Sequence, residues 1–568
     1  MDKRSIIGFI IIFVIILVFS KYVFPPPPQQ PPSTDQDTSL VQQQPDTTPI
    51  QAETIPPETP TIAAVDSAKM AEMKSAELET EKIITIETKN IIFQLSSRGG
   101  TLRQVVLKEH VRYDGANVSL MGDYFEPDWT KHGAITIGYR DQIPVFNDLN
   151  FKTEGGDLYL NETFPEGSVK FTYYAPDGSF IIKTYSFFYD SYLFDLDINI
   201  EMPENLGMRE GVTVSWFAPL EPSEKDFRHD RDRLGGFFNG GANFDYRDDL
   251  HDGKLREISS GTTDWVATRT KYFSAIIISK DVPGDEVIVV GSEIMRPDPK
   301  RKDFKWEQYG IGITYNHPPD NLSLNFEVYT GPNDYDLLKS MGKNLSSLVY
   351  MGWNFFRPFA IFIHWIFTSL FSIIPNYGWV IVVFSFLMKI VFWPLSHKSA
   401  KSMHKMKLIQ PKLQEIKAKY KDDPGRMQKE TMAAYKESGV NPFGSCLPML
   451  VQLPIFWAMF AVLSNSIELR GAPFILWITD LSQPDPTGEY LYVGVLPIIM
   501  GIAMFIQQKM TITDPKQKMM VYILPVVFTF LFSKWASGLV LYWTVFSIMG
   551  IAEQWFVKQR LKEDKAAA

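Results

Sequence analysis

Apolar residues follow two different patterns along this chain of 568 residues. In the first half they alternate with polar residues in short runs, such as Val169-Lys-Phe-Thr-Tyr and Leu193-Phe-Asp-Leu-Asp-Ile-Asn-Ile, and turn-forming segments such as Ala175-Pro-Asp-Gly separate these runs. A period of two is typical of strands with one buried face, and many such runs indicate an all-β sandwich. The sequence therefore predicts a β-sandwich domain at residues 81–335.

The second half carries nearly continuous apolar runs instead of alternating ones. Each run is close to the ~20 residues that a helix needs to cross a hydrocarbon core. Prolines inside these runs, such as Pro448 and Pro497, are tolerated better in membrane helices than in soluble ones. We predict transmembrane helices at residues 372–396, 441–465, 490–508, 519–536 and 537–558.

The N-terminal segment, residues 1–24, combines Lys3 and Arg4 with a long apolar run. A secretory signal peptide would need small residues at a cleavage site, and bulky Tyr22, Val23 and Phe24 stand there instead. We therefore predict an uncleaved transmembrane anchor. The Pro- and Gln-rich residues 25–80 cannot bury enough apolar surface to offset the entropy of ordering, so we predict a disordered linker.

A further apolar run at residues 345–371 is rich in aromatic residues and contains Arg357, Pro358 and His364. Counting it as a span would place the basic residues 397–440 outside the cell. An amphipathic helix that lies in the outer membrane interface explains the pattern better.

Charge follows the same topology. Residues 397–440 hold eleven Lys and Arg against five acids, and basic residues recur in the 509–518 loop and in the short tail 559–568. The 466–489 loop has Arg470 against four acids. Because positive residues favour the cytoplasmic side, we expect both termini in the cytoplasm and the β domain in the periplasm.

The basic segment 397–440 also has apolar residues at three- and four-residue spacing on either side of Lys421-Asp-Asp-Pro-Gly. This spacing indicates two antiparallel amphipathic helices joined by a tight turn. The hairpin is either a solvated connector or a docking arm for a membrane surface, a nascent chain or ribosomal RNA. Candidate docking residues there and in the next inside loop are Lys405, Lys412, Lys419, Lys516 and Lys518.

Lys389 stands well inside a predicted span. A Lys at the centre of a membrane helix costs about 2.5–3.5 kcal/mol, so it should face the protein interior or a wet cavity. Alternatively, its long stem could extend to the inner headgroups. Ser385, four residues earlier, shares its helical face.

Other polar residues in the spans are individually typical of helix packing, but together with Lys389 they suggest a partly hydrated interior. They are Gln452, Gln507, Gln508, Tyr542 and Glu553. No phosphate-binding loop or hydrolase motif is present in the sequence, and Asp230 and Asp232 beside His229 are more typical of a solvated loop than of a glycosidase. With a single Cys and eight scattered His, we predict no disulfide, metal site, cofactor or catalytic residue.

Several segments resemble the YidC/Oxa/Alb family of membrane protein insertases. They are Val440-Asn-Pro-Phe-Gly-Ser-Cys-Leu-Pro-Met-Leu-Val-Gln-Leu-Pro-Ile-Phe, Glu468-Leu-Arg-Gly-Ala-Pro-Phe, Leu476-Trp-Ile-Thr-Asp-Leu-Ser and Ser537-Gly-Leu-Val-Leu-Tyr-Trp. The similarity covers roughly residues 350–560, and its motifs are specific. The layout of an extra anchor, a large periplasmic β domain and a five-span core is similar to the Gram-negative YidC form.

The resemblance implies a hydrophilic groove that is open to the cytoplasm and the lipid, closed outside, and marked by one positive residue. By its position before Trp393-Pro394-Leu395, that residue is Lys389, where the family commonly has Arg; Lys keeps the charge but lacks the planar fork that binds a carboxylate. The resemblance also assigns Ser385 and Tyr542 to the groove, and we add Gln452. A greasy slide for the substrate helix would contain Leu453, Phe456, Phe460, Ile523 and Val527.

The function implied is a non-enzymatic insertase of the bacterial inner membrane. Expected partners are nascent membrane proteins, the lipid bilayer, the Sec translocon and, weakly, the ribosome; DNA is not expected. Two alternatives are a secondary transporter, which should show internal repeats and paired broken helices, and a membrane-anchored periplasmic glycan-binding protein.

Overall fold

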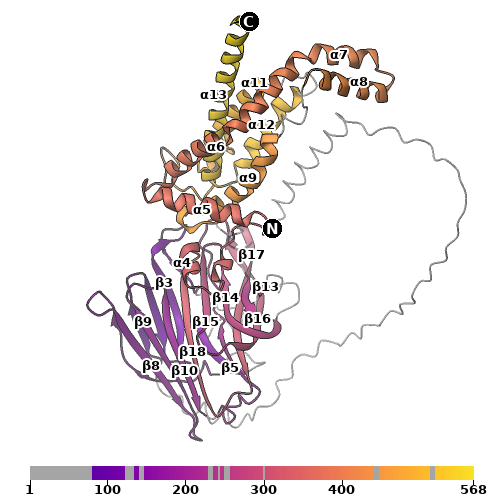
Figure 1. Cartoon of the computed structure of the whole chain (residues 1–568). Coiled ribbons are helices and arrows are strands. Elements are labelled where there is room, and N and C mark those ends of the chain that lie inside the picture. Colours follow the sequence, from indigo (N-terminus) through magenta and orange to yellow (C-terminus); the bar gives the residue numbers. More distant parts are fainter. Residues whose placement is uncertain are drawn as a thin grey trace, which may run out of the picture.

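The computed structural model describes residues 80–567 except 122–132, 140–145, 202, 228–229, 231–234, 241–242, 248–255, 299–300, 440–446 and 512–517. The predicted anchor and nearly all of the predicted linker lie outside the described residues. A β domain comes first in the chain, and a bundle of helices stands on one end of it (Figure 1).

The β domain consists of strands that lie between residues 83 and 332. Their bounds are β1 (Ile83–Glu87), β2 (Ile91–Ser96), β3 (Thr101–Val111), β4 (Asn117–Ser119), β5 (Ala134–Tyr139), β6 (Lys152–Glu154), β7 (Leu158–Tyr159), β8 (Glu166–Tyr174), β9 (Phe180–Phe188), β10 (Leu193–Glu201), β11 (Gly211–Trp216), β12 (Gly236–Gly240), β13 (Asn243–Arg247), β14 (Arg256–Arg269), β15 (Phe273–Ser279), β16 (Gly284–Asp298), β17 (Arg301–Asn316) and β18 (Asn321–Pro332). The all-β prediction is confirmed.

Two layers share one core. In the first layer β6, β8, β9, β10, β18, β15, β14 and β12 pair in that order, and in the second β14, β16, β17, β11, β5, β3, β2 and β1 do so. β14 belongs to both layers because it pairs with β16 as far as Thr263 and with β15 from Trp265 onward, and a bulge between Ser260 and Thr263 shifts its register with β16. Strands that switch sheets in this way commonly do so at bulges. Gly261 has φ +151° there, a conformation that L side chains rarely adopt.

Alternation along the strands builds this core. Both β9 and β10 show buried and half-buried residues in strict succession. The ring of Phe93 on β2 lies 4.8 Å from that of Phe187 on β9 and 5.5 Å from that of Phe194 on β10, so it joins the two layers.

Lys183 on β9 is an exception to this apolar filling. Its side chain is buried, and Nζ donates to the carbonyl oxygens of Gly99 at 2.7 Å and Ile135 at 2.8 Å. Burial lowers the pKa of Lys183 to about 7.

This pKa predicts a pH-dependent stability. Between about pH 7 and 10.5 the unfolded chain binds more protons at Lys183 than the folded domain, so the free energy of unfolding rises with pH, by up to about 1.4 kcal/mol per pH unit. Calorimetry of the full-length protein in detergent should show this rise for the β-domain transition, and Lys183→Met should remove most of it. The same slope in both proteins would contradict the assignment.

The helical part begins where the strands end. Its elements are α4 (Tyr335–Ser340), the 3-10 turns η2 (Leu345–Leu348) and η4 (Ile467–Leu469), α5 (Arg357–Phe371), α6 (Tyr377–Leu408), α7 (Gln410–Lys419), α8 (Pro424–Glu437), α9 (Leu447–Asn465), α10 (Gly488–Leu491), α11 (Val495–Thr511), α12 (Lys518–Phe532) and α13 (Ser537–Ala567). Tyr377–Ser399 and Ser537–Val557 are long and apolar enough to cross a membrane, and four shorter apolar helices accompany them.

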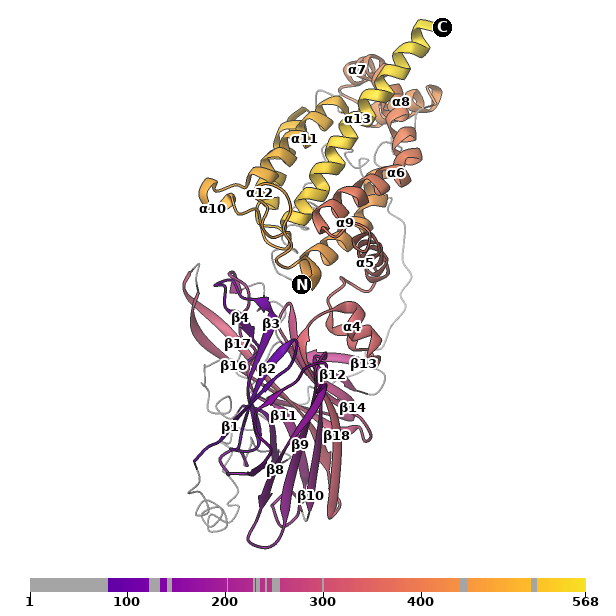
Figure 2. The same cartoon turned by 90° about the vertical axis from the view of Figure 1, so that its left-hand side faces the viewer.

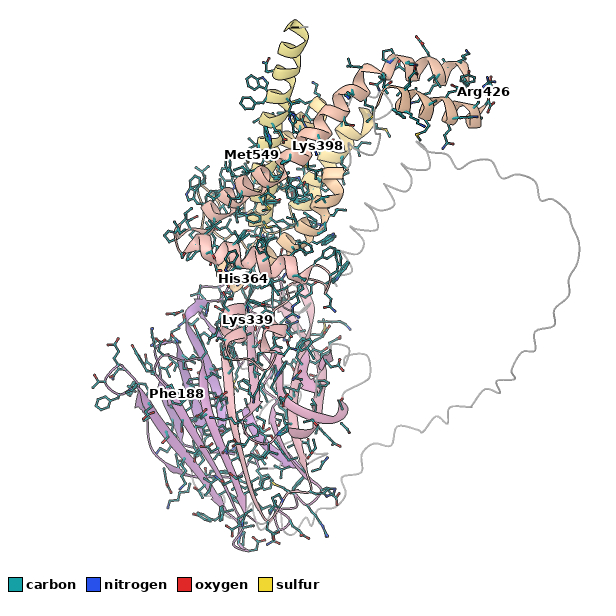
Figure 3. The ribbon with its side chains drawn as sticks, in the orientation of Figure 1. Phe188, Lys339, His364, Lys398, Arg426 and Met549 are labelled. Atoms are coloured by element: carbon teal, nitrogen blue, oxygen red, sulfur yellow. The ribbon has the colours of Figure 1, made fainter. Side chains whose placement is uncertain are left out.

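α5 lies across the end of the bundle that faces the β domain (Figure 1). Pro358 stands in its first turn, where its missing N–H is not needed, so the helix begins at Arg357 rather than at the predicted residue 345. One face of α5 is buried, and His364 on it lies 3.3 Å from Asp336 Oδ2 of α4 (Figure 3). The other face exposes Phe359, Phe362 and Trp365.

α6 continues past residue 396, where the sequence predicted the span to end, and its last turns leave the bundle. It ends at Leu408 because Pro411, in the first turn of α7, has no N–H to donate to the carbonyl of Lys407 and so interrupts the helical hydrogen bonds. α7 and α8 then form an antiparallel hairpin that projects at the end of the molecule far from the β domain (Figure 1). Asp423 caps α8 by accepting from the Arg426 N–H at 3.0 Å.

A buried polar contact joins the bundle to the β domain. Arg470, which follows η4, donates from Nε to Glu224 Oε1 at 2.7 Å and from Nη2 to the Val111 carbonyl at 2.7 Å. Gln483 donates to the other carboxylate oxygen of Glu224. Nearby, burial and then the Arg470 charge lower the pKa of His110 to about 4.

Arg470→Met should therefore raise the pKa of His110, without restoring the ordinary value in full, because burial is the larger cause. Histidine hydrogen–deuterium exchange across pH, read by mass spectrometry, would measure the shift. His317, which lies in the same domain, serves as an internal reference. An unchanged His110 profile would show that Arg470 does not face this ring in solution.

Candidate functional site

Three helices surround the region that the sequence singled out. α13 packs along α6 and α11, and the part of α13 nearest the β domain also contacts α9. Figure 2 shows α13 running the length of the bundle beside α11, and Met549 and Lys398 in Figure 3 mark α13 and α6. These helices bring residues from distant parts of the sequence into one interior.

Lys389 on α6 lies inside this bundle, paired with Glu553 on α13. Its Nζ is 2.7 Å from Glu553 Oε2, and the side chains are 8% and 6% exposed. Lys389 stands near the middle of its span, whereas Glu553 is four residues before the end of the apolar part of α13 at Val557. Lys389 thus has a partner within the protein, which disfavours the alternative that its side chain extends to the headgroups.

Two neighbours shape the space around the ammonium group. The ring of Phe546 on α13 has its centroid 4.6 Å from Lys389 Nζ, a geometry that stabilises a cation. A Cβ at Gly550 would lie 2.3 Å from Gln507 Nε2 and 3.5 Å from Lys389 Nζ. Glycine at position 550 therefore allows α11 to bring its amide close to the pair.

The other predicted groove residues lie toward the outer side. Ser385 is fully buried and donates to the Ile381 carbonyl of its own helix at 2.7 Å. The hydroxyl of Tyr542 on α13 is hydrogen-bonded to the Gln452 side chain of α9. The rings of Tyr542 and Phe546 are 5.8 Å apart, so Phe546 connects this contact to the Lys389–Glu553 pair.

Sequence reasoning named Glu553 as a polar residue in a span but did not predict its role as the partner of Lys389. A signal was present: two opposite charges inside two predicted spans each require a partner in a low-dielectric environment. The rotation of α13 relative to α6, which brings the two side chains together, could not be derived from either helix alone.

The predicted slide residues fall into two groups. Leu453, Ile523 and Val527 are exposed on the surface of the bundle. Phe456 and Phe460 instead pack in an aromatic cluster at the outer end, with ring centroids 5.2 Å from Trp543 and Trp535, respectively.

The described docking residues lie on the last turns of α6, on α7 and at the start of α12. Lys405, Lys412 and Lys419 are exposed, and Lys412 Nζ lies 2.6 Å from Glu437 Oε2, which ties α7 to α8. Lys518 begins α12, and Lys516 lies outside the described residues.

These features define a class, a protein with a polar site within a bundle of apolar, membrane-length helices and a large β domain at one end of the bundle. Comparison with family models identifies the family. The model "YidC periplasmic domain" matches residues 83–366, and the model "60Kd inner membrane protein" matches residues 366–565. The chain belongs to the YidC family of membrane protein insertases.

Curated relatives agree over the full length. The chain is 32% identical to a membrane protein insertase YidC of Prosthecochloris aestuarii, over 100% of this chain and 96% of the relative. It is also 32% identical to one of Geotalea daltonii, over 99% and 100%. A solved structure of an active YidC insertase matches 87% of this chain and 99% of its own chain, with 18% identity and a TM-score of 0.37. The family assignment rests on the sequence matches. These sequence matches favour the insertase hypothesis over the transporter and glycan-binding alternatives.

The buried pair predicts a non-additive effect on stability. Lys389→Met leaves the Glu553 carboxylate buried without its partner and should destabilise the protein by about 3–5 kcal/mol. The double variant Lys389→Met with Glu553→Met removes both charges and should recover most of that loss. Thermal unfolding in detergent measures both, and additive losses would contradict a direct pairing.

Proposed function

We propose that this protein inserts hydrophobic segments of newly made proteins into the bacterial inner membrane through the interior site around Lys389. The carrying observation is the position of the Lys389 ammonium group, which lies near the middle of a membrane-length helix and inside the bundle. A cation held at that depth attracts the acidic or polar flank of a substrate segment and lowers the free energy of holding it there.

The insertion step needs no chemical fuel in this mechanism. Transfer of the substrate helix from water to lipid releases about 25 cal/mol per Å² of apolar surface. The exposed apolar residues Leu453, Ile523 and Val527 offer a path toward the lipid beside the site. The membrane potential adds about 2.3 kcal/mol per 100 mV for each charge that crosses in the favourable direction.

The topology that fits this mechanism places the α7–α8 hairpin and both chain termini in the cytoplasm. The hairpin then meets nascent chains. Its exposed Lys412 and Lys419, together with Lys405 near the end of α6, favour weak contact with the ribosome. α5 lies in the outer interface, with Phe359, Phe362 and Trp365 toward lipid. The protein works alone or beside the Sec translocon.

Reconstitution tests the role of Lys389. Liposomes that contain purified protein receive a one- or two-span substrate with an acidic flank, and protease protection scores insertion. Lys389→Gln should lower insertion about tenfold, the effect of roughly 1.4 kcal/mol, whereas Lys389→Arg should retain it because the charge is kept. Circular dichroism verifies that each variant is folded.

Equal insertion by the wild type and a folded Lys389→Gln variant would overturn the role of the charge and leave the apolar surface as the insertion path. If the wild type itself fails to insert the substrate, the proposed function is wrong.

A further inference from the structure

The cation that should receive an acidic substrate already has a carboxylate bound to it. Glu553 Oε2 lies 2.7 Å from Lys389 Nζ, and both side chains are more than nine-tenths buried. A substrate carboxylate cannot occupy the same position without moving Glu553. Resting protein and substrate therefore compete for one ammonium group.

We propose that Glu553 is a displaceable internal counter-ion of Lys389 that competes with the acidic flank of a substrate for the ammonium group. The inference rests on the proposed function and deepens it. Exchange of one carboxylate for another preserves an ion pair at Lys389. A neutral flank brings no charge that could replace Glu553, so it leaves the pair in place, because breaking it would leave a buried charge unmatched.

The contacts of the Glu553 carboxylate indicate that the ion pair is stable at rest but can be broken. Glu553 uses one carboxylate oxygen toward Lys389, while Oε1 is buried and has no hydrogen-bond partner among the described residues. A carboxylate with one unsatisfied oxygen is less stable in an apolar interior than one with both oxygens bonded. Lys supplies a point charge and not the planar fork of Arg, which would hold both oxygens.

The displaced carboxylate of Glu553 also lies a short distance from water. Glu553 stands four residues before Val557, where the apolar part of α13 ends, which corresponds to about 6 Å along the helix axis. Lys389 meanwhile keeps the ring of Phe546 at 4.6 Å, so the ammonium group retains one stabilising neighbour during the exchange.

Specificity is therefore the readout that separates this role from a structural one. The liposome assay is run with two substrates that differ in one flank, one with Asp or Glu and one with Asn or Gln at the same positions. In the wild type the acidic substrate should insert better. In Glu553→Gln the acidic substrate no longer has to displace a carboxylate, whereas the neutral substrate gains nothing, so the ratio of acidic to neutral insertion should rise by about fivefold or more.

Two further variants keep the experiment decisive. Glu553→Asp shortens the side chain and weakens the pair, so its ratio should lie between those of the wild type and Glu553→Gln even if the latter is poorly folded. Gln554→Leu, on the same helix, removes a neighbouring amide without touching the pair and should keep the wild-type ratio.

If Glu553→Gln and Glu553→Asp change the insertion of both substrates by the same factor, or leave both unchanged, Glu553 is a structural residue and the inference is overturned. Lys389→Gln separates this failure from failure of the proposed function. If Lys389→Gln still impairs insertion while the ratio does not respond to Glu553, the charge role of Lys389 stands and only the counter-ion exchange falls.

Discussion

A charge within a membrane-spanning bundle has to be matched, and the pair of Lys389 and Glu553 meets that constraint here. The rest of the interior is arranged around it. Phe546 faces the ammonium group, and Gly550 leaves room for the approach of Gln507. Because a lone buried charge is far more costly than a matched one, α6 and α13 are fixed in one rotation relative to each other. In the proposed mechanism the same pairing keeps a cation at the depth where the polar flank of a substrate is bound.

The β domain follows a different logic, in which alternation along each strand decides the structure. The runs at Phe180–Phe188 and Leu193–Glu201 could be predicted because every second residue faces the core. The course of β14 could not, since neither its change of partner from β16 to β15 nor the bulge between Ser260 and Thr263 leaves a periodic signal. The buried Lys183 was also missed, because an alternating pattern does not say which polar residue points inward.

In the helical part, composition predicted Lys389 as the central residue, and a resemblance in sequence motifs supplied the family. Composition did not reveal where the helices end. α6 continues through Pro394 but ends before Pro411. Because a proline does not always interrupt a helix, its position in the sequence alone does not fix where a helix ends. The slide prediction treated Phe456 and Phe460 as equivalent to Leu453. Phe456 instead packs against rings of α12 and α13, and Phe460 against Trp535 in the turn between these helices.

That aromatic cluster has a consequence for the energy supply of the cell. A polar site inside a membrane protein is a place where water and protons could begin to cross. The rings of Phe456, Phe532, Trp535 and Trp543 pack against one another at the outer end of the bundle. In the proposed mechanism, where water reaches the ion pair from the cytoplasmic side, these apolar faces would stop a chain of water molecules from continuing to the outer side. Insertion would then proceed without dissipating the proton gradient.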